Sequence, residues 1–363
     1  MTKQKYYSSK KLRKVKCDYY FIIGQKSNGK SFDIKSLLIK EALKDGRRFA
    51  YMRRWFPDRT ASKVERYFTD DKLFIVNDYS PYTEVQAYTD TIYLGNRTEQ
   101  GKKTKDFIIG YSVGLSSEQH YASMPFPEVY NILFEEFITD TGYFGQGTQE
   151  VDIFMRMCST ILREREDTTI YMIGNTISRF CPYFTYFNID ITKLKKGTIT
   201  YFKFKKVDEK TGKTVDVLIG IEWCDNIVDN KKILGNASKM VNGGEWLTSN
   251  VPIVNRDTRQ DKLLFKYYVK KENSIYKCLV LNGDNNEPYI FVYPYNNESK
   301  IKSSDRYFTD NIEMQSICHC ANLTKSLTCD ILLNEIYKLN RICYSDSLTG
   351  TEFETIRNER GWK

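Results

Sequence analysis

Short apolar runs alternate with segments of helical periodicity through the first half of the chain. Residues 19–23 are continuously apolar and end at Gly24, which is typical of a strand buried on both faces of a parallel sheet. In residues 30–43 the apolar side chains recur at helical spacing, and the following Asp45-Gly46 indicates the end of a helix. Further strands are predicted at 49–52, 129–134 and 169–173, and a further helix at 151–162. This order predicts an α/β protein with an open parallel sheet.

The pattern changes after about residue 192. Residues 193–206 interleave lysines with aromatic side chains, and residues 207–219 predict a hairpin around Thr211-Gly212. Farther along, strands are predicted at 263–269, 276–281 and 289–293, followed by a helix at 326–339. We therefore predict an α/β domain, a connector and a smaller C-terminal α+β domain, over residues 1–207, 208–250 and 251–363 respectively.

The composition is that of a folded protein with a basic beginning. Of the 363 residues, 41% are hydrophobic and 28% are charged, which excludes a disordered chain. The 55 basic and 46 acidic residues give a net charge of +9, and the first 16 residues alone hold seven basic residues and no acidic one. This uneven charge argues against an acidic housekeeping enzyme and weakly favours a polyanionic partner such as nucleic acid. The alternative, a solvated lead-in to the first strand, fits many proteins.

Neither hydropathy nor cysteine spacing indicates a membrane or secreted protein. No window approaches 18 consecutive apolar residues, so we expect no transmembrane helix, and five apolar residues after the basic leader are too few for a signal peptide. The nine cysteines form no Cys-x-x-Cys pair, which indicates reduced thiols in the cytoplasm. One cluster of possible zinc ligands is present, although buried thiols are the simpler interpretation. It consists of Cys318, His319, Cys320, Cys329 and Cys343.

One motif carries specific chemistry. Residues 24–31, Gly-Gln-Lys-Ser-Asn-Gly-Lys-Ser, match G-x-x-x-x-G-K-[ST] between a predicted strand and a predicted helix. In this arrangement backbone N–H groups of the loop converge on a phosphate, the lysine reaches the β- and γ-oxygens, and the serine hydroxyl binds Mg²⁺. We therefore predict that ATP and Mg²⁺ are bound by Gly24, Lys26, Ser27, Asn28, Gly29, Lys30 and Ser31. A second Gly-Lys-Thr, at residues 212–214, lacks the first glycine and lies in the predicted hairpin.

Two acids follow a later strand. Glu135 and Glu136 come directly after the apolar run 129–134, where a nucleotide hydrolase needs a carboxylate for Mg²⁺ and a second one to activate water. We predict that Glu135 contacts the metal with Ser31, and that Glu136 polarises the attacking water. The alternative is a pair of exposed acids at the end of a strand. A catalytic glutamate beside the metal acid is typical of the additional-strand P-loop hydrolases, whereas kinases and GTPases usually lack it.

Two further polar positions are weaker candidates. Asn175 follows the strand predicted at 169–173 and is suited to orient water or to sense the γ-phosphate, although Gly-Asn is also an ordinary turn. Arg163 ends the predicted helix before that strand, and an arginine there could stabilise the transition state in a neighbouring subunit. A solvated helix end with local ion pairs is the simpler interpretation of Arg163.

Together, five segments resemble the DNA-packaging (encapsidation) ATPases of small, short-tailed phages of the Picovirinae type. The Arg-Arg after the second strand and the Pro-Tyr-Phe…Phe-Asn segment are the most specific features, whereas the P-loop alone is generic. The resemblance covers roughly residues 18–190 and is loose in the C-terminal third, around 279–283. The matching segments are 21–31, 51–55, 132–137, 163–166 and 174–188.

The resemblance implies a terminase-like P-loop motor of the additional-strand, catalytic-glutamate type. Its parallel sheet would carry helices on both faces, and the motor would act as a homomeric ring, a pentamer, on double-stranded DNA at the phage portal of a procapsid. It implies a place in the host cell cytoplasm, transiently at the portal, and absence from the finished virion. Matched by motif, Glu136 is the catalytic glutamate, Arg163 the arginine that acts in trans, and Asn175 the coupling residue. The need for a packaging RNA stays open.

Two departures from the family pattern concern the site. Glu135 stands where the family usually has aspartate, and Lys26 stands in the P-loop where arginine is usual, which loses a bidentate fork. Arg165 lies two residues from Arg163, so the identity of the trans-acting arginine is left open between them.

The C-terminal domain of the family resembles an RNase H-like nuclease that has lost its active site. Here the strand at 276–281 carries no acid, and Asp284 lies in the turn after it, so we expect a nucleic-acid-binding domain that does not cleave. Residues 193–206 and 262–277 are candidate phosphate contacts, and a solvated face explains each equally well. The alternatives are a large terminase with an active nuclease, another P-loop translocase or helicase, and a nucleotide-dependent assembly protein that does not hydrolyse.

Overall fold

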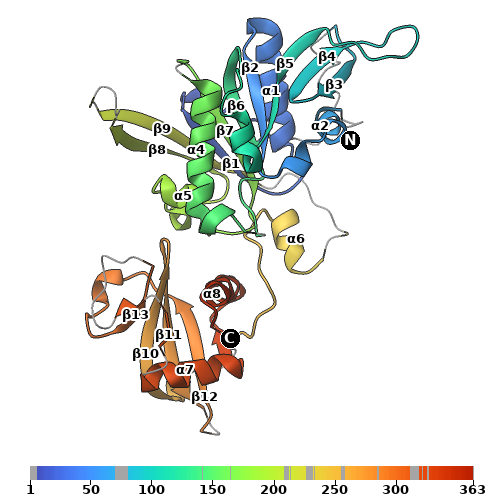
Figure 1. Cartoon of the computed structure of the whole chain (residues 1–363). Coiled ribbons are helices and arrows are strands. Elements are labelled where there is room, and N and C mark those ends of the chain that lie inside the picture. Colours follow the sequence, from blue (N-terminus) through green and yellow to red (C-terminus); the bar gives the residue numbers. More distant parts are fainter. Residues whose placement is uncertain are drawn as a thin grey trace. The chain divides into compact units, whose positions relative to one another are not determined.

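The structure, a computed structural model, divides the chain into two compact units (Figure 1). One unit comprises Met1–Ile177, Cys181–Ile233 and Met240–Glu245, and the other Ser178–Phe180, Leu234–Lys239 and Trp246–Lys363. The residues described are 6–69, 81–140, 142–163, 165–207, 212, 214–225, 232, 234–254, 258–283, 286–310, 319–320, 322–324 and 327–362.

The first unit is built on a mixed, mostly parallel sheet. Among the described residues it has nine strands in the order β3-β4-β5-β2-β6-β7-β1-β9-β8, of which the six from β5 to β9 run parallel. This confirms the predicted α/β class and the predicted strands β1, β2, β6 and β7. In chain order the bounds are β1 Tyr19–Gly24, β2 Arg48–Arg53, β3 Glu84–Tyr88, β4 Thr91–Gly95, β5 Phe107–Gly114, β6 Val129–Glu135, β7 Thr169–Asn175, β8 Thr198–Val207 and β9 Thr214–Trp223.

Helices cover both faces of this sheet (Figure 1). The side chains of β1 alternate between the two: Ile22 belongs to the core that α1 (Lys30–Asp45) and α2 (Ala61–Phe68) share, whereas the ring of Phe21 meets Phe184 of α5 (Pro182–Tyr186). The helix α4 (Thr148–Leu162) packs on β6 on the same side as α5, where Phe134 meets Phe154. The helices predicted at 30–43 and 151–162 are thus present, and Gly46 ends α1 in the left-handed conformation. The short helices are α3 Glu118–Tyr121 and α6 Asn236–Val241.

The sequence pattern did not predict the strands β3, β4 and β5. The first two form a hairpin of five-residue strands, and β5 lies between β4 and β2 inside the sheet. Glycines weaken the strand signal of β5, yet the sheet requires one of them. A Cβ at Gly110 would lie 2.1 Å from the carbonyl oxygen of Phe49, so only glycine fits the close approach of β5 to β2.

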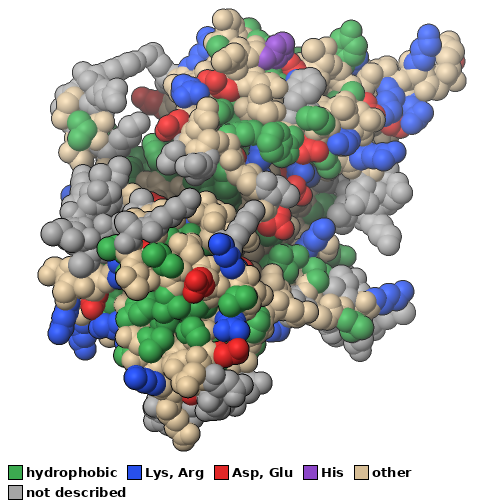
Figure 2. Space-filling model, turned by 60° about the horizontal axis from the view of Figure 1, so that its bottom comes forward, with side chains coloured by type: hydrophobic (Ala, Val, Ile, Leu, Met, Phe, Trp, Pro, Cys, Tyr) green, Lys and Arg blue, Asp and Glu red, His purple; other side chains and the backbone are tan. Residues whose placement is uncertain are grey.

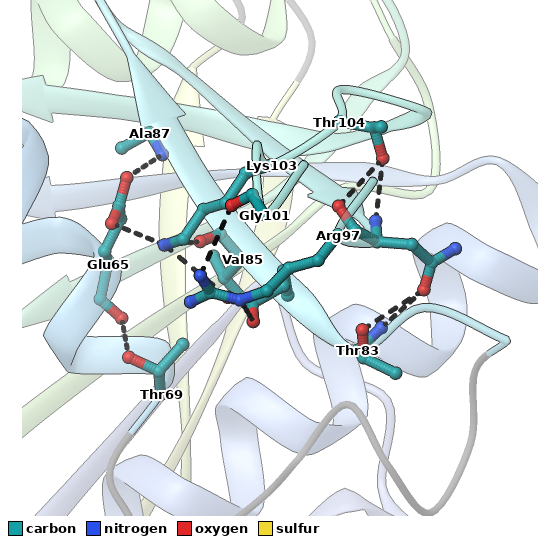
Figure 3. Close-up of polar contacts among 11 residues, drawn as sticks. Glu65, Thr69, Thr83, Val85, Ala87, Arg97, Gly101, Lys103 and Thr104 are labelled. Carbon is teal, nitrogen blue, oxygen red and sulfur yellow. Dashed lines mark hydrogen bonds and ion pairs between the residues drawn. The ribbon is translucent and has the colours of Figure 1, made fainter. Parts of the chain in front are cut away.

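A set of polar contacts fastens the β3–β4 extension to α2 (Figure 3). The carboxylate of Glu65 accepts hydrogen bonds from the backbone N–H of Ala87, at 3.1 Å, and from Lys103, at 2.9 Å. Arg97 pairs with Glu84 on β3. These contacts join the β3–β4 extension to α2 at the base of the β4–β5 loop.

The second unit has its own smaller sheet. Among the described residues six strands lie in the order β14-β13-β10-β11-β12-β15, and the three predicted strands are present as β10, β11 and β12, which run antiparallel. The core joins Cys278 and Ile290 of the sheet to Leu333 and Phe353 of the two helices. The helix predicted at 326–339 is present as α7. The bounds are β10 Lys262–Lys271, β11 Ser274–Asn282, β12 Pro288–Pro294, β13 Arg306–Phe308, β14 His319–Cys320, α7 Thr328–Lys338, β15 Ile342–Tyr344 and α8 Ser347–Glu359.

The stretch expected to connect the two domains, residues 208–250, contributes β9 to the first sheet, where β9 runs parallel to β1. The predicted hairpin is formed by β8 and β9, and most of its turn, residues 208–211 and 213, lies outside the described residues. Of the cysteine cluster, Cys318 also lies outside them, whereas Cys329 and Cys343 are half-buried thiols. No helix in the described part of the chain is long and apolar enough to span a membrane.

Candidate active site

The predicted site residues meet at one edge of the first sheet, where its parallel strands end. Gly24 at the end of β1 is registered against Asn175 at the end of β7, and Glu135 at the end of β6 is registered against Ile173. The strand β7 therefore lies between the strand that leads into the P-loop and the strand that ends in the acids. Ligands of open α/β sheets bind at this edge.

The two glycines of the P-loop are needed for its shape. Gly24 has φ +144° and Gly29 has φ +96°, both in the left-handed half of backbone space that favours glycine. A Cβ at Gly24 would also lie 3.1 Å from the Cβ of Cys224. Ser27, between the glycines, has φ +62°, so the loop turns sharply before α1 begins at Lys30.

Lys30 is buried inside the loop that it follows. Its ammonium donates to the carbonyl oxygen of Gln25 and to Oδ1 of Asn28, at 2.5 and 3.2 Å. Only 4% of the residue is exposed. Burial lowers the pKa of Lys30 to about 8, against the opposing effect of Cys224 and Glu135. The lysine thus lies at the centre of the loop and is poised to lose its charge at mildly alkaline pH.

Segments with no predicted site role hold the loop from outside. The backbone N–H of Tyr7 donates to the carbonyl oxygen of Asn28, at 3.0 Å, and Ser9 donates to the carboxylate of Asp33 in the first turn of α1. The side chain of Gln25, fully buried, donates to the carbonyl oxygen of Asn242. Part of the basic leader therefore supports the P-loop, a role that its charge did not reveal.

Glu135, the predicted metal ligand, is buried among cationic and hydroxyl groups. Its Oε2 accepts a hydrogen bond of 2.5 Å from Tyr51 and lies 3.3 Å from the ammonium of Lys35 and 3.6 Å from the guanidinium of Arg53. Burial raises the pKa of Glu135, but Lys35, Ser31, Tyr51 and Arg53 outweigh it, so that the net pKa lies below its usual range. The carboxylate is therefore ionised at neutral pH.

The residues present fit a divalent cation. The Ser31 hydroxyl lies beside the Glu135 carboxylate, and Oε1 of Glu135 is buried without a hydrogen bond of good geometry among the described residues. A serine hydroxyl and an ionised carboxylate are oxygen ligands of the kind that Mg²⁺ prefers. The longer side chain of glutamate, compared with the usual aspartate, is held in place by Tyr51 and Lys35.

Glu136, the predicted catalytic residue, lies beyond the end of β6 and points to solvent. Its side chain is 62% exposed, and its Oε2 accepts a hydrogen bond of 2.7 Å from Arg53. The backbone of Glu136 has φ +60°, and its N–H donates to the carbonyl oxygen of Ile173 on β7. Arg53 thus contacts both acids, and its hydrogen bond holds one oxygen of the exposed Glu136 carboxylate.

The remaining residues predicted to contact the nucleotide lie as follows. Asn175 is half-buried at the end of β7, next to Gly24, and its carbonyl oxygen accepts from the N–H of Ile177. Lys26 and Ser27 are exposed at the tip of the loop, whereas Asn28 is buried.

Arg163 lies away from this site within its own chain. It is exposed just after α4, and it donates to the carbonyl oxygen of Met124, before β6 begins, at the opposite edge of the sheet. The 15 residues of α4 span about 22 Å between the two edges. Arg165 is engaged with carbonyl oxygens of α4 and of Phe126. Of the two arginines, Arg163 is the more exposed.

The sequence predicted no site role for the side chains that surround the acids, although Arg53-Arg54 is part of the resemblance. Tyr51 and Arg53 come from β2, which lies next to β6, and Arg54 directly follows this strand. Lys35 comes from the second turn of α1. A signal was present, because charged residues directly after a buried strand predict the same sheet edge as the acids. Lys35 gave no signal, since a lysine on a helix is ordinarily exposed.

Comparisons with known proteins agree with this geometry. The model of the family "Podovirus DNA encapsidation protein (Gp16)" matches residues 1–207. The DNA packaging protein of Bacillus phage B103 is 32% identical over 175 residues, 48% of this chain and 49% of that protein. The DNA packaging protein of Bacillus phage phi29 is 28% identical over 195 residues, 53% of this chain and 54% of that protein.

The matched region therefore spans about half the length of these relatives. Among solved structures, the bacteriophage phi29 viral genome packaging motor assembly aligns over 98% of this chain and 99% of that chain, with a TM-score of 0.53. At 18% identity this likeness shows the fold alone. Since the family model covers more than half of the 363 residues, the resemblance seen in the sequence is confirmed, and the chain belongs to the Podovirus DNA encapsidation protein (Gp16) family.

Proposed function

We propose that this protein is an ATPase that translocates double-stranded DNA and packages a phage genome into a procapsid. The proposal rests on one observation: Lys30, Glu135 and Glu136 lie at the same edge of the sheet. There β7 separates β1, which leads into the P-loop, from β6, which ends at the acids. This strand order is the one expected of the additional-strand P-loop hydrolases. The family membership and the names of the relatives from phages B103 and phi29 supply the substrate, DNA.

In this proposal each residue has a distinct role in hydrolysis. The loop from Gly24 to Gly29 cradles the phosphates with its N–H groups, and Lys30 turns from the loop carbonyls to the β- and γ-oxygens. Glu136 accepts a proton from the attacking water, and Asn175 orients that water or senses the γ-phosphate. Ser31 and Glu135 would hold Mg²⁺, which neutralises charge on the phosphates.

For the second unit we propose an RNase H-like domain that binds nucleic acid without cleaving it. In support, no group of three or more His, Cys, Asp or Glu side chains suited to a metal lies together among the residues described. A working nuclease of this kind needs several carboxylates around two metals. The rival, a large terminase with an active nuclease, is tested by incubating the protein with Mn²⁺ and plasmid. Cleavage that disappears when acids of the second unit are mutated would favour the rival.

The trans-acting role proposed for Arg163 predicts complementation between inactive subunits. Arg163→Ala subunits keep Glu136, and Glu136→Gln subunits keep Arg163, so a mixed ring contains some complete sites. With random mixing at equal amounts we expect about a quarter of the sites to be complete, because each site pairs two neighbours in a head-to-tail ring. ATP turnover is measured across mixing ratios.

Arg165→Ala provides the matched control, since Arg165 lies two residues away but is engaged with backbone carbonyls. If ATP turnover recovers when Glu136→Gln subunits are mixed with Arg165→Ala subunits but not with Arg163→Ala subunits, Arg165 is the trans-acting arginine. No recovery with either variant would contradict action in trans.

The β8–β9 hairpin is the candidate DNA contact that the structure supports best. Lys203 and Lys205 are exposed on one face of the edge strand β8, whereas Phe204, on the other face, meets Phe187. Elsewhere, on the face drawn in Figure 2, Lys and Arg side chains are spread among acidic and hydrophobic ones. Because surface charge alone singles out no site there, the test concerns individual lysines.

Replacing Lys203 or Lys205 by alanine is expected to weaken DNA binding uniformly across sequences. If each lysine contacts one phosphate, each substitution reduces the slope of log affinity against log salt by about 1. The slope is measured by fluorescence anisotropy with a labelled duplex. The exposed Lys44→Ala is the control, and an unchanged slope in both hairpin variants would remove the hairpin from the contact surface.

The proposed partners are double-stranded DNA, further copies of the chain in a ring, and the phage portal. By the same reasoning the protein acts in the host cytoplasm and transiently at the procapsid. The solved phi29 assembly is titled a viral genome packaging motor, which supports this placement. The first experiment is phosphate release from ATP by the purified protein with and without linear duplex DNA. Hydrolysis that DNA stimulates supports the proposal, and the absence of hydrolysis in both conditions would defeat it.

A further inference from the structure

Arg54 is a buried arginine that directly follows β2. Its Nε donates to both carboxylate oxygens of Glu150, at 3.0 and 3.1 Å. Its two terminal nitrogens donate to the backbone carbonyl oxygens of Glu136, at 2.9 Å, and Phe137, at 2.8 Å. Only 6% of the residue is exposed. One guanidinium thus joins a buried carboxylate to the main chain of the residue proposed to activate water.

These contacts occur where the backbone needs support. Glu136 lies just beyond β6 and has φ +60°, a conformation that a residue with a side chain rarely adopts. Its N–H is held by the carbonyl oxygen of Ile173, and its carbonyl is held by Arg54. With both sides of the residue fixed, the direction in which the Glu136 side chain leaves the backbone is set. Such strain persists only where surrounding contacts determine it.

Glu150 makes the burial of Arg54 possible. It is fully buried in the first turn of α4 and also accepts hydrogen bonds from the Tyr183 hydroxyl, at 3.0 Å, and from the N–H of Phe144, at 3.1 Å. The carboxylate is therefore satisfied on both oxygens, which a buried charge requires. Arg54 is directed into the protein, unlike Arg53, which contacts the side chains of the two acids.

We propose that Arg54, anchored by Glu150, is a positioning residue that fixes the backbone of Glu136 and thereby aims its carboxylate at the attacking water. The inference rests on the proposed catalytic role of Glu136. It adds a structural link, because Glu150 lies in the first turn of α4 and Arg163 follows the end of the same helix. The segment that carries the catalytic glutamate is thus tied directly to the helix that would present the arginine to a neighbouring subunit.

The test compares two ways of removing the link. Arg54→Lys keeps a cation beside Glu150 but loses the fork that reaches both carbonyls. The double variant Arg54→Met with Glu150→Gln removes the link without leaving an unpaired buried charge. For both, we expect kcat for ATP to fall at least tenfold, whereas the Kd of a non-hydrolysable ATP analogue stays within twofold of the wild type. Thermal unfolding shows whether each variant is folded.

A second buried ion pair provides the matched control. Arg59 and Asp90 are 7% and 3% exposed, and Asp90 lies in the turn between β3 and β4. The double variant Arg59→Met with Asp90→Asn should keep kcat within about twofold of the wild type. We expect this even if its melting temperature falls as much as that of the Arg54 variants. Wild-type kcat in a folded Arg54 variant, or an equal loss of kcat in the Arg59 control, would overturn the positioning role. Wild-type turnover and its loss in Glu136→Gln, measured alongside, test the proposed function separately.

Discussion

Replacing Glu136 by glutamine is expected to lower ATP turnover by about 10²- to 10⁴-fold, the range that a positioned general base contributes. The amide keeps the size of the side chain and a hydrogen bond to Arg53, but it cannot take a proton from water. Binding of ATP should persist, because Lys30 and the P-loop are untouched. Phosphate release and the Kd of a non-hydrolysable ATP analogue are measured on the same preparation.

The control for this variant is Glu166→Gln, an exposed acid beyond the end of α4. It removes the same charge at the opposite edge of the sheet and should leave turnover unchanged. Equal turnover in the wild type and in Glu136→Gln would show that Glu136 is an ordinary exposed acid at the end of a strand. A loss of nucleotide binding together with turnover would place Glu136 in binding.

The affinity for ATP is expected to fall as the pH rises above about 8, because burial lowers the pKa of Lys30 to about 8. A bound phosphate favours the protonated lysine and raises its pKa, so above pH 8 binding takes up a proton. By linkage, the affinity for ATP falls about tenfold per pH unit above pH 8, until the pH reaches the pKa that Lys30 has in the complex. Below pH 8 the affinity does not depend on this group. Titrations with a non-hydrolysable analogue between pH 6.5 and 9.5, roughly, cover this range.

Two substitutions separate the charge of Lys30 from other effects of pH. In the Lys30→Arg variant the arginine stays protonated throughout this pH range. Its affinity for the ATP analogue should therefore not fall as the pH rises above 8. Lys30→Ala loses a charged hydrogen bond to phosphate, which corresponds to at least about tenfold in affinity at pH 7. If the wild type and Lys30→Arg show the same pH dependence, the titrating group is another one.

Periodicity and motif spacing were sufficient to place the central strands and the P-loop. The strands β1, β2, β6 and β7 are apolar runs bounded by polar residues, and α1 carries both helical spacing and a glycine stop. The hairpin β3–β4 and the strand β5 were not predicted, because short strands and strands that contain glycine have the sequence pattern of loops. Gly110 is required by the approach of two backbones, and such tertiary contacts leave little trace in a single sequence.

The candidate site could be predicted as far as its residues follow a motif or a strand end. The edge that joins Gly24, Asn175 and the two acids follows from the direction of the parallel strands. The environment of the acids could not be predicted, because Lys35 and Tyr51 reach Glu135 only through the packing of α1 and β2. The same holds for Arg54 and Glu150, which are 96 residues apart and meet only in the folded chain.

Coupling between the ATPase and DNA is best measured by DNA-stimulated ATP hydrolysis across a series of salt concentrations. Contacts to phosphates release counterions, so we predict strong stimulation by linear duplex DNA at low salt and a steady loss of stimulation as salt rises. The basal rate without DNA should change far less over the same series. A rate that is the same with and without DNA at every salt concentration would contradict the claim.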